Sequence, residues 1–171
     1  MIALDAEKPD NQSILFGYYL ARLTGSGLTG IFLEDLPAED TQNEKIFYNS
    51  VFSGDGNPGS APEIAFKEKI SLENIRVFKT ACEQRGIAWL VHRDQGAPLK
   101  ELITESSYAD LIITGAGLFA SSPLETPAGL VEDLLVKSEC PVIITAHRAE
   151  PVAKILFACD GSVSSLFAIK Q

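Results

Sequence analysis

Short apolar runs alternate with longer segments whose apolar residues recur at helical spacing along most of the chain. Continuous apolar runs are typical of strands buried on both faces, and five are present: MIALD, LTGIFL, IAWLVHR, ADLIIT and CPVIIT. The segments between them predict helices at about 12–23, 63–85, 97–107 and 129–138. This alternation predicts an α/β fold, a doubly wound, five-stranded parallel sheet with helices on both faces.

Two of these helices show an apolar periodicity that predicts which side faces the core. In the first helix the predicted core residues are Leu15, Tyr18, Tyr19 and Leu23. In the long helix they are Leu72, Ile75, Phe78 and Cys82, and Gly86 follows in the position where glycine often ends a helix. The polar segment 34–62 is rich in Gly, Pro and Asn and is expected to be a long loop or crossover excursion.

The residues after the fifth predicted strand repeat the pattern of the first ones. Both MIALDAEKPDNQSILFGYYL and KILFACDGSVSSLFAIKQ read as an apolar strand ending in Asp, a polar turn with Ser, and an apolar helix with aromatic residues. We therefore expect a complete domain over 1–146, a linker over 147–153, and the first strand and helix of a second, truncated repeat over 154–171. The alternative is a single domain with one extra strand.

Charge and cysteine content narrow the classes of partner and compartment. The net charge of −9, with no cluster of Lys or Arg, argues against a nucleic-acid partner. No apolar run approaches the ~20 residues that span a bilayer, so no membrane partner is expected. Cys82, Cys140 and Cys159 are odd in number and adjoin apolar stretches, which indicates buried, reduced thiols and a cytoplasmic protein.

Candidate chemistry gathers where the strands end, because doubly wound sheets bind ligands beyond the carboxyl ends of their strands. Asp5, Asp94 and Gly115 follow or close predicted strands. A phosphoacceptor site at Asp94 would need a Lys after the fifth strand, and ITAHRAE offers none. His92 and His147 have no partner at metal-ligand spacing, and neither a Walker A loop nor a G-x-S-x-G elbow is present.

Four segments in this order resemble the universal stress protein family. They are the strand that ends in Asp (IALD, and ILFACDGS), the block RDQGAPLKELITESSYADLIITGAG, the Gly-led loop after it, and the final strand in SECPVIIT. The resemblance implies a flavodoxin-like sheet, also described as adenine-nucleotide-α-hydrolase-like. It also implies pairing of two domains, as a homodimer or within a tandem chain, through the fifth strand at Val142, Ile143 and Ile144.

The same resemblance implies ATP or AMP as the ligand of many members and indicates candidate nucleotide-binding residues. In the first domain these are Asp5, Gly115, Gly117, Ser121, Ser122 and Gly129; in the second repeat they are Asp160, Gly161 and Ser162. Asp5 would accept a hydrogen bond from adenine or ribose; alternatively, it caps the turn that follows it. The glycines would let backbone N–H groups approach phosphates.

The first-domain loop departs from the family's phosphate pattern, which is Gly, two residues, Gly, nine residues, then Gly with Ser or Thr. With Gly115 first, Leu118 and Ala128 replace the next two glycines, and Gly129 replaces the hydroxyl residue. Pro123 and Pro127 lack N–H groups, and Glu125 adds a repulsive carboxylate.

We therefore expect a non-catalytic stress-response or regulatory protein with a degenerate loop and no bound ATP or other cofactor. The alternative is a protein that binds ATP or AMP, or weakly hydrolyses ATP, mainly through the second repeat.

Overall fold

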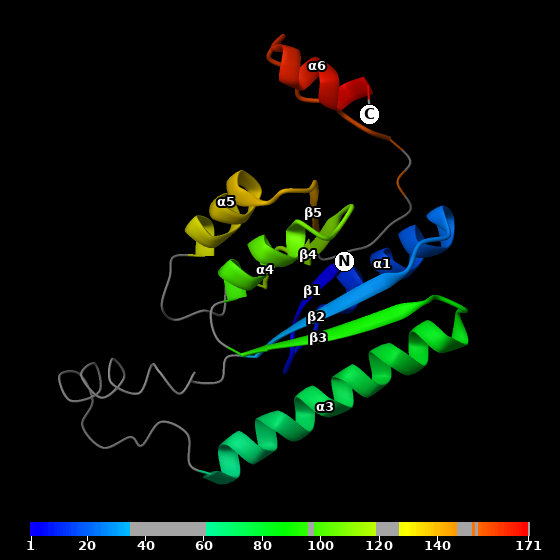
Figure 1. Ribbon diagram of the computed structural model, residues 1–171, viewed down its shortest axis with the longest axis vertical. Coiled ribbons are helices and arrows are strands. Elements are labelled where there is room, and N and C mark those ends of the chain that lie inside the picture. The colour runs from blue at the N-terminus through cyan, green and yellow to red at the C-terminus, as the bar shows by residue number, and fades with distance from the viewer. Residues whose placement is uncertain (35–60, 96–97, 119–126, 147–151, 153, 171) are drawn as a thin grey trace, which may run out of the picture.

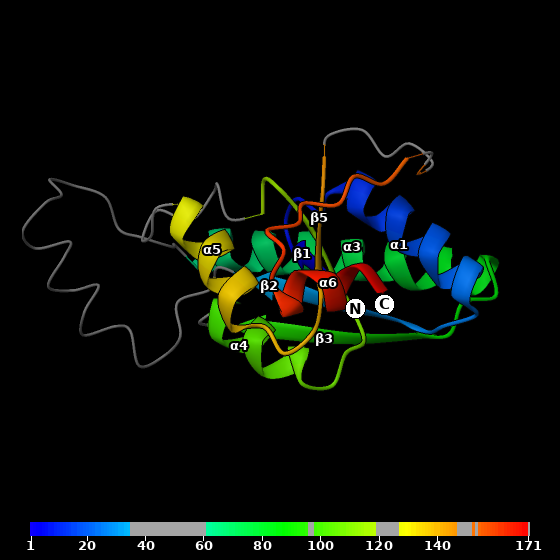
Figure 2. The same cartoon turned by 90° about the horizontal axis from the view of Figure 1, so that it is seen from above.

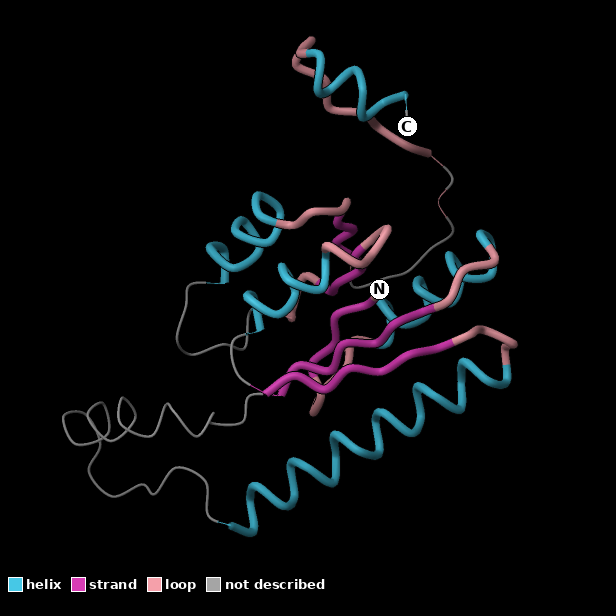
Figure 3. Tube along the Cα trace, in the orientation of Figure 1, coloured by secondary structure: helices cyan, strands magenta, loops and turns pink. Residues whose placement is uncertain are grey.

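The described part of the chain forms one parallel sheet with helices on both faces. The computed structural model describes residues 1–34, 61–95, 98–118, 127–146, 152 and 154–170. The strands are β1 (Ile2–Asp5), β2 (Leu28–Glu34), β3 (Trp89–Gln95), β4 (Ile112–Gly115) and β5 (Val142–Thr145). All neighbouring strands are parallel, in the order β3-β2-β1-β4-β5 (Figures 1 and 3). This confirms the predicted five-stranded α/β fold.

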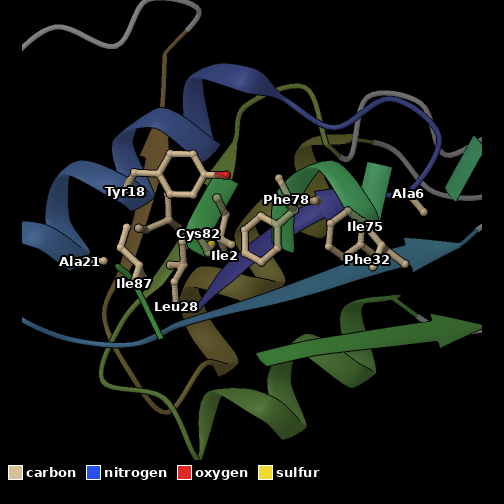
Figure 4. Close-up of a cluster of buried hydrophobic side chains, with 12 residues drawn as sticks. Ile2, Ala6, Tyr18, Ala21, Leu28, Phe32, Ile75, Phe78, Cys82 and Ile87 are labelled. Atoms are coloured by element: carbon tan, nitrogen blue, oxygen red, sulfur yellow. The ribbon is translucent and has the colours of Figure 1, made fainter. Parts of the chain in front are cut away.

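Helices cover the two faces of the sheet through two separate apolar clusters. The helices are α1 (Asn11–Thr24), α3 (Ala61–Gln84), α4 (Pro98–Ser106), α5 (Pro127–Lys137) and α6 (Val163–Lys170). On one face, α1 and α3 pack on Ile2, Leu28 and Phe32 (Figure 4). On the other face, α4 and α5 contribute Leu102 and Leu134. None of the described helices combines the length and apolar character needed to cross a membrane.

The core face of α1 differs from the predicted one. Tyr18 is buried as predicted, but Leu15, Tyr19 and Leu23 are 50%, 43% and 68% exposed. The buried positions of the helix are Ser13, Gly17, Tyr18 and Ala21. Gly17 faces β1 and β2: a Cβ added to it would lie 3.4 Å from Ile2 Cδ1 and 3.5 Å from Leu28 Cδ1, which are ordinary van der Waals distances. The apolar pattern alone therefore indicated the wrong side of this helix.

The core face of α3 is largely as predicted. Ile75, Phe78 and Cys82 are buried, whereas Leu72 is about half exposed. The Phe78 ring packs edge-on against Phe32, with 5.7 Å between ring centroids. Gly86 follows the helix with a φ of 65°, a conformation that favours glycine, as the pattern predicted.

The segment after β5 contains the predicted helix, α6, but not the predicted strand. Residues 154–160 form no strand, and Ile155, Leu156 and Phe157 are exposed. A strand needs a hydrogen-bonding neighbour, and Figure 1 shows this segment and α6 apart from the sheet; the overlap in Figure 2 arises only from the direction of view. Cys159 is exposed here, contrary to the expectation of a buried thiol, whereas Cys82 is buried. The division of the chain into one domain, a linker and a second repeat stays a prediction.

Candidate functional site

The strand order places a crevice between the ends of β1 and β4. From β1 the chain adds β2 and β3 on one side, then crosses to add β4 and β5 on the other. The loops after β1 and β4 therefore diverge, which is where doubly wound sheets bind ligands. A cavity of about 450 Å³ lies at this point. Its wall is formed by Ala3, Leu4, Asp5, Lys8, Pro9, Asp10, Asn11, Gln12, Gly115, Ala116, Gly117, Leu118, Thr145 and Ala146.

Asp5, the last residue of β1, caps the turn that follows it. Its Oδ1 accepts hydrogen bonds from the backbone N–H groups of Glu7 (2.8 Å) and Lys8 (2.9 Å). The Asn74 amide of α3 holds the same turn by donating to the carbonyl of Ala6 at 2.8 Å. The capping role weighed from the sequence is therefore present. Contact of Asp5 with a ligand stays a prediction.

Asp10 is a second carboxylate at the cavity, and the sequence reasoning missed it. It is the N-cap of α1, where its side chain accepts from the N–H groups of Gln12 (3.2 Å) and Ser13 (3.1 Å). Its Oδ2 also accepts from the hydroxyls of Ser13 (2.5 Å) and Thr145 (3.4 Å). The signal was present in the sequence, because Asp directly before a helix is a preferred N-cap.

The hydrogen bonds around Asp10 keep its carboxyl group ionised. Burial raises the pKa of this group, but the bonds from Ser13, the Gln12 N–H and Thr145 outweigh burial, and the pKa lies below its usual value. The Thr145 hydroxyl also lies 2.6 Å from the Ser13 hydroxyl and 3.2 Å from the Thr114 carbonyl, and its one proton is donated to one of these acceptors or to Asp10 at a time. The ionised Asp10 side chain thus connects the start of α1 to Thr145 at the end of β5, and Thr145 in turn contacts the end of β4.

Gly115 provides the room that this carboxylate occupies. A Cβ added to Gly115 would lie 2.7 Å from Asp10 Oδ2 and 3.2 Å from Asp10 Cγ. A Cβ on Gly117, two residues later in the same turn, would meet nothing within 4 Å. Gly115 is therefore explained by the approach of an internal carboxylate, a contact that sequence inspection did not anticipate.

Two backbone donors of the turn after β4 are already used within the protein. The Ala116 N–H donates to the Thr145 carbonyl at 3.3 Å, and the Leu118 N–H donates to the Gly115 carbonyl at 3.1 Å. Phosphate-binding turns instead direct successive N–H groups toward the ligand. The start of this turn is thus closed by internal hydrogen bonds.

Thr114 adds a buried polar atom beside this turn. Among the side chains that the structure describes, its Oγ1 is buried without a hydrogen-bond partner, and the residue is only 1% exposed. Thr114 lies opposite Ala3 in the parallel register of β1 and β4, so the two side chains share a face of the sheet. Ala3 and Asp5, on that face of β1, both line the cavity.

The remaining candidate nucleotide residues lie either outside the described residues or on elements other than β1 and β4. Ser121 and Ser122 lie outside the described residues, and Gly129 lies in the first turn of α5. Asp160, Gly161 and Ser162 precede α6 and are not among the cavity residues. The Ser162 N–H donates to Asp160 Oδ1 at 2.9 Å, and hydrogen bonding with Ser162 lowers the pKa of Asp160 to about 2.

The other titratable residues considered from the sequence lie within β3 or outside the described residues. Asp94 lies within β3, not beyond it as predicted, because β3 continues to Gln95. His92 lies in the same strand, and its Nδ1 is 3.2 Å from a carboxylate oxygen of Glu105 in α4. His147 lies outside the described residues. No group of three His, Cys, Asp or Glu side chains suited to a metal ion occurs in the described residues.

An ion pair at the end of β2, between a buried carboxylate and a partly exposed guanidinium, was also missed. Glu34 is 6% exposed and accepts from Arg93 Nε (2.8 Å) and Nη2 (3.1 Å), as well as from the Ser71 hydroxyl (2.5 Å). Glu34 raises the pKa of the Arg93 guanidinium. Glu34 and Arg93 lie on neighbouring strands and Ser71 lies on α3, so the spacing of these residues along the sequence gave no sign of the contact.

Comparisons with known proteins support the fold. No protein-family model and no curated protein matches the chain. A universal stress protein family structure from Burkholderia pseudomallei aligns with a TM-score of 0.54 at 16% identity, covering 84% of this chain and 93% of that one. UspA from Lactobacillus plantarum aligns at 0.52 and 15%, covering 84% and 94%. An Arabidopsis thaliana universal stress protein family structure with AMP bound aligns at 0.50 and 13%, covering 86% and 92%. The chain therefore has the universal stress protein fold.

Proposed function

We propose that this chain is a non-catalytic, cytoplasmic universal stress protein whose site between β1 and β4 does not hold ATP. Two observations support family membership: the order of the sequence motifs, and a likeness in fold to universal stress proteins that covers 84% of this chain. A stress-response or regulatory role follows from that membership. The degenerate state of the site rests on its own residues.

The observation that carries the proposal is the position of the Asp10 carboxylate. It is held against Gly115 by the hydroxyls of Ser13 and Thr145, where an ATP-binding loop would offer bare backbone to phosphate. Leu118 adds a bulky apolar side chain to the cavity wall. A triphosphate would therefore meet a like charge and would find two N–H groups of the turn already used.

The test is thermal unfolding of the chain with and without Mg-ATP. A ligand at one hundred times its Kd stabilises a protein by about 2.7 kcal/mol, so ATP bound with a Kd of ~10 μM would raise the Tm by several degrees at ~1 mM. We expect no such rise. A clear increase in Tm with ATP, lost when Asp5 is replaced by Ala, would contradict the proposal.

A second candidate function is nucleotide binding or weak ATP hydrolysis through the C-terminal segment. The turn Asp160-Gly161-Ser162 favours it, because Gly161 has a φ of 79° and Ser162 accepts from the Ser165 N–H at the start of α6. The AMP-bound Arabidopsis structure makes AMP the first ligand to test. If nucleotide binding is lost in Asp160→Ala and kept in Asp5→Ala, this candidate replaces the first.

Pairing of two domains through β5 is part of the proposal. Within the described sheet, β5 is an edge strand, hydrogen-bonded to β4, and Ile144 is exposed on it. Exposed apolar strand edges are normally covered. We expect sedimentation to show a dimer that Ile144→Lys weakens, whereas a monomer at all concentrations would count against pairing between copies.

A further inference from the structure

Residues 154–158 have the composition of a β-strand but pair with no strand of the described sheet. Three apolar side chains follow one another in this run, and Ile155, Leu156 and Phe157 are 71%, 96% and 54% exposed. β-branched and aromatic residues favour strands, and an exposed run of this kind binds to free strand edges. Figure 1 shows the run away from the sheet, on the way to α6. The run is therefore a strand that lacks an edge.

β3 is a strand edge with room for another strand. In the described sheet it neighbours β2 alone, and it has seven residues, against four in β5, the other edge (Figure 3). Its His92 lies opposite Ile31, which packs with Leu102 of α4, so α4 covers this face of the sheet. Leu90 is on the same face and is 54% exposed. α4 therefore leaves part of the β3 edge uncovered.

A cavity of about 320 Å³ lies beside His92 at this edge. It is lined by Ile31, His92, Arg93, Glu101 and Glu105. Glu105 lies 3.2 Å from His92 Nδ1, whereas Glu101 forms no ion pair with any residue that the structure describes. The Arg93 guanidinium is bound by the carboxylate at the end of β2. The cavity therefore suits a positively charged side chain carried on an added strand.

An antiparallel register brings such a side chain to the cavity. With Leu156 opposite the exposed Leu90, Lys154 lies opposite His92, beside the two cavity carboxylates. A parallel strand with the same leucine pair would carry Lys154 away from His92 and toward the start of β3. Apolar pairs and opposite charges across two strands both stabilise their pairing.

The other face of β3 matches the run in the same register. Phe157 lies opposite Trp89, which gives an aromatic pair. Ile155 lies opposite Val91, which gives a β-branched pair. Trp89 and Val91 are both partly buried against the core that α1 and α3 form, so the added side chains would extend that core. Parallel sheets commonly carry one antiparallel edge strand.

We propose that residues 154–158 of one copy add to β3 of a second copy as a sixth, antiparallel strand, with Lys154 in the cavity at Glu101 and Glu105. The partner is a second copy because the run follows β5, and β3 of the same chain lies at the opposite edge of its sheet. Exchange between two copies pairs the run and covers the edge of each. This contact depends neither on pairing through β5 nor on the site between β1 and β4.

Facing cysteines test the register. Leu90→Cys and Leu156→Cys would be introduced into two separate full-length chains, both carrying Cys159→Ser, and the chains mixed under oxidising conditions. Cysteines opposite each other in an antiparallel pair are close enough to form a disulfide. We expect a covalent dimer with one chain of each kind. Leu23→Cys, which replaces an exposed leucine on α1, is the control and should give about tenfold less of this dimer.

An exchange of charges tests the cavity. Lys154→Glu should weaken dimerisation roughly twofold to thirtyfold, because a repulsive pair replaces an attractive one. Glu101→Lys should weaken it similarly, and the two changes together should restore the affinity to within about threefold. Lys170→Glu on α6 is the control, since it changes the net charge equally outside the contact. Sedimentation of these variants in the Ile144→Lys background measures the association without a contribution from β5.

The outcomes separate this contact from the pairing proposed through β5. Hetero-dimers linked through Leu90→Cys and a dimer that persists in Ile144→Lys would support the contact, even if nucleotide binds elsewhere. Equal cross-linking to Leu23→Cys, or a link within one chain that carries both Leu90→Cys and Leu156→Cys, would overturn it. A monomer at all concentrations in Ile144→Lys would also overturn it and leave pairing through β5 standing. Failure of the double charge variant to recover affinity would overturn the role of Lys154.

Discussion

Replacing Gly115 by Ala tests whether this glycine exists for an internal contact or for a ligand. The new Cβ would lie 2.7 Å from Asp10 Oδ2 and 3.2 Å from Asp10 Cβ and Cγ. Oδ2 is anchored by the Ser13 N–H, the Ser13 hydroxyl and Thr145, so it cannot move away without losing hydrogen bonds. The backbone of Gly115 is outside the left-handed region, so the cost is steric.

The expected loss of stability follows from three terms. Overpacking costs about 1–3 kcal/mol, and displacing an N-cap carboxylate costs about 0.5–2 kcal/mol. Replacing Gly by Ala restricts the unfolded chain, which returns about 0.4–1 kcal/mol. The net destabilisation is about 0.5–4.5 kcal/mol, which lowers the Tm of a chain of this length by about 1–18 °C.

Gly117→Ala is the control in the same turn, because its Cβ would meet nothing within 4 Å. It should leave the free energy of unfolding unchanged or slightly raised. Urea unfolding of both variants, with equal m-values, gives the comparison. The contact is tested directly in the Asp10→Ser background, where the shorter side chain should reduce the cost of Gly115→Ala by about 1 kcal/mol or more. Equal costs for the two glycines, or no coupling with Asp10, would refute the reasoning.

Two further predictions concern other buried groups. Arg93→Met removes the two guanidinium hydrogen bonds to buried Glu34 and should destabilise the fold by about 1–3 kcal/mol in urea unfolding, whereas Arg76→Met, on the exposed Glu73 pair, should cost far less. Burial raises the pKa of Tyr18 from 10.0 to about 12. The stabilisation that comes from keeping the buried phenol neutral is therefore complete below pH 10 and is lost as the pH rises toward 12. Between pH 10 and pH 12 the free energy of unfolding should fall by about 2–3 kcal/mol less in Tyr18→Phe than in the unchanged chain, which makes the fall in Tm less steep. An unchanged alkaline profile would contradict this.

Much of the fold was readable from local pattern, since the physical causes are local. Continuous apolar runs predicted all five strands, and helical periodicity predicted the helices between them. Gly86 was identified as a helix end because its left-handed conformation is a property of one residue. The place of the site, at the carboxyl ends of the strands, followed from the βα alternation and general topology.

The local pattern failed where a residue's role depends on what lies opposite. Leu15 and Leu23 were predicted as core residues because they are apolar, yet α1 buries Ser13, Gly17, Tyr18 and Ala21 and leaves both leucines exposed. The run at Ile155 was predicted to be a strand, but a strand must hydrogen-bond to a neighbouring strand, and residues 154–160 pair with none in the described sheet.

The sequence by itself determined the five strands of the parallel sheet, the helices between them, and the departure of the loop after β4 from a phosphate-binding pattern. Only the tertiary structure decided why Gly115 is there, since its neighbour is Asp10, which lies on another element and far away in the chain. The same holds for Glu34 and Arg93, which meet through the register of β2 and β3. Periodicity reports which side of an element is buried, but close contacts between elements are set by packing, which no single segment encodes.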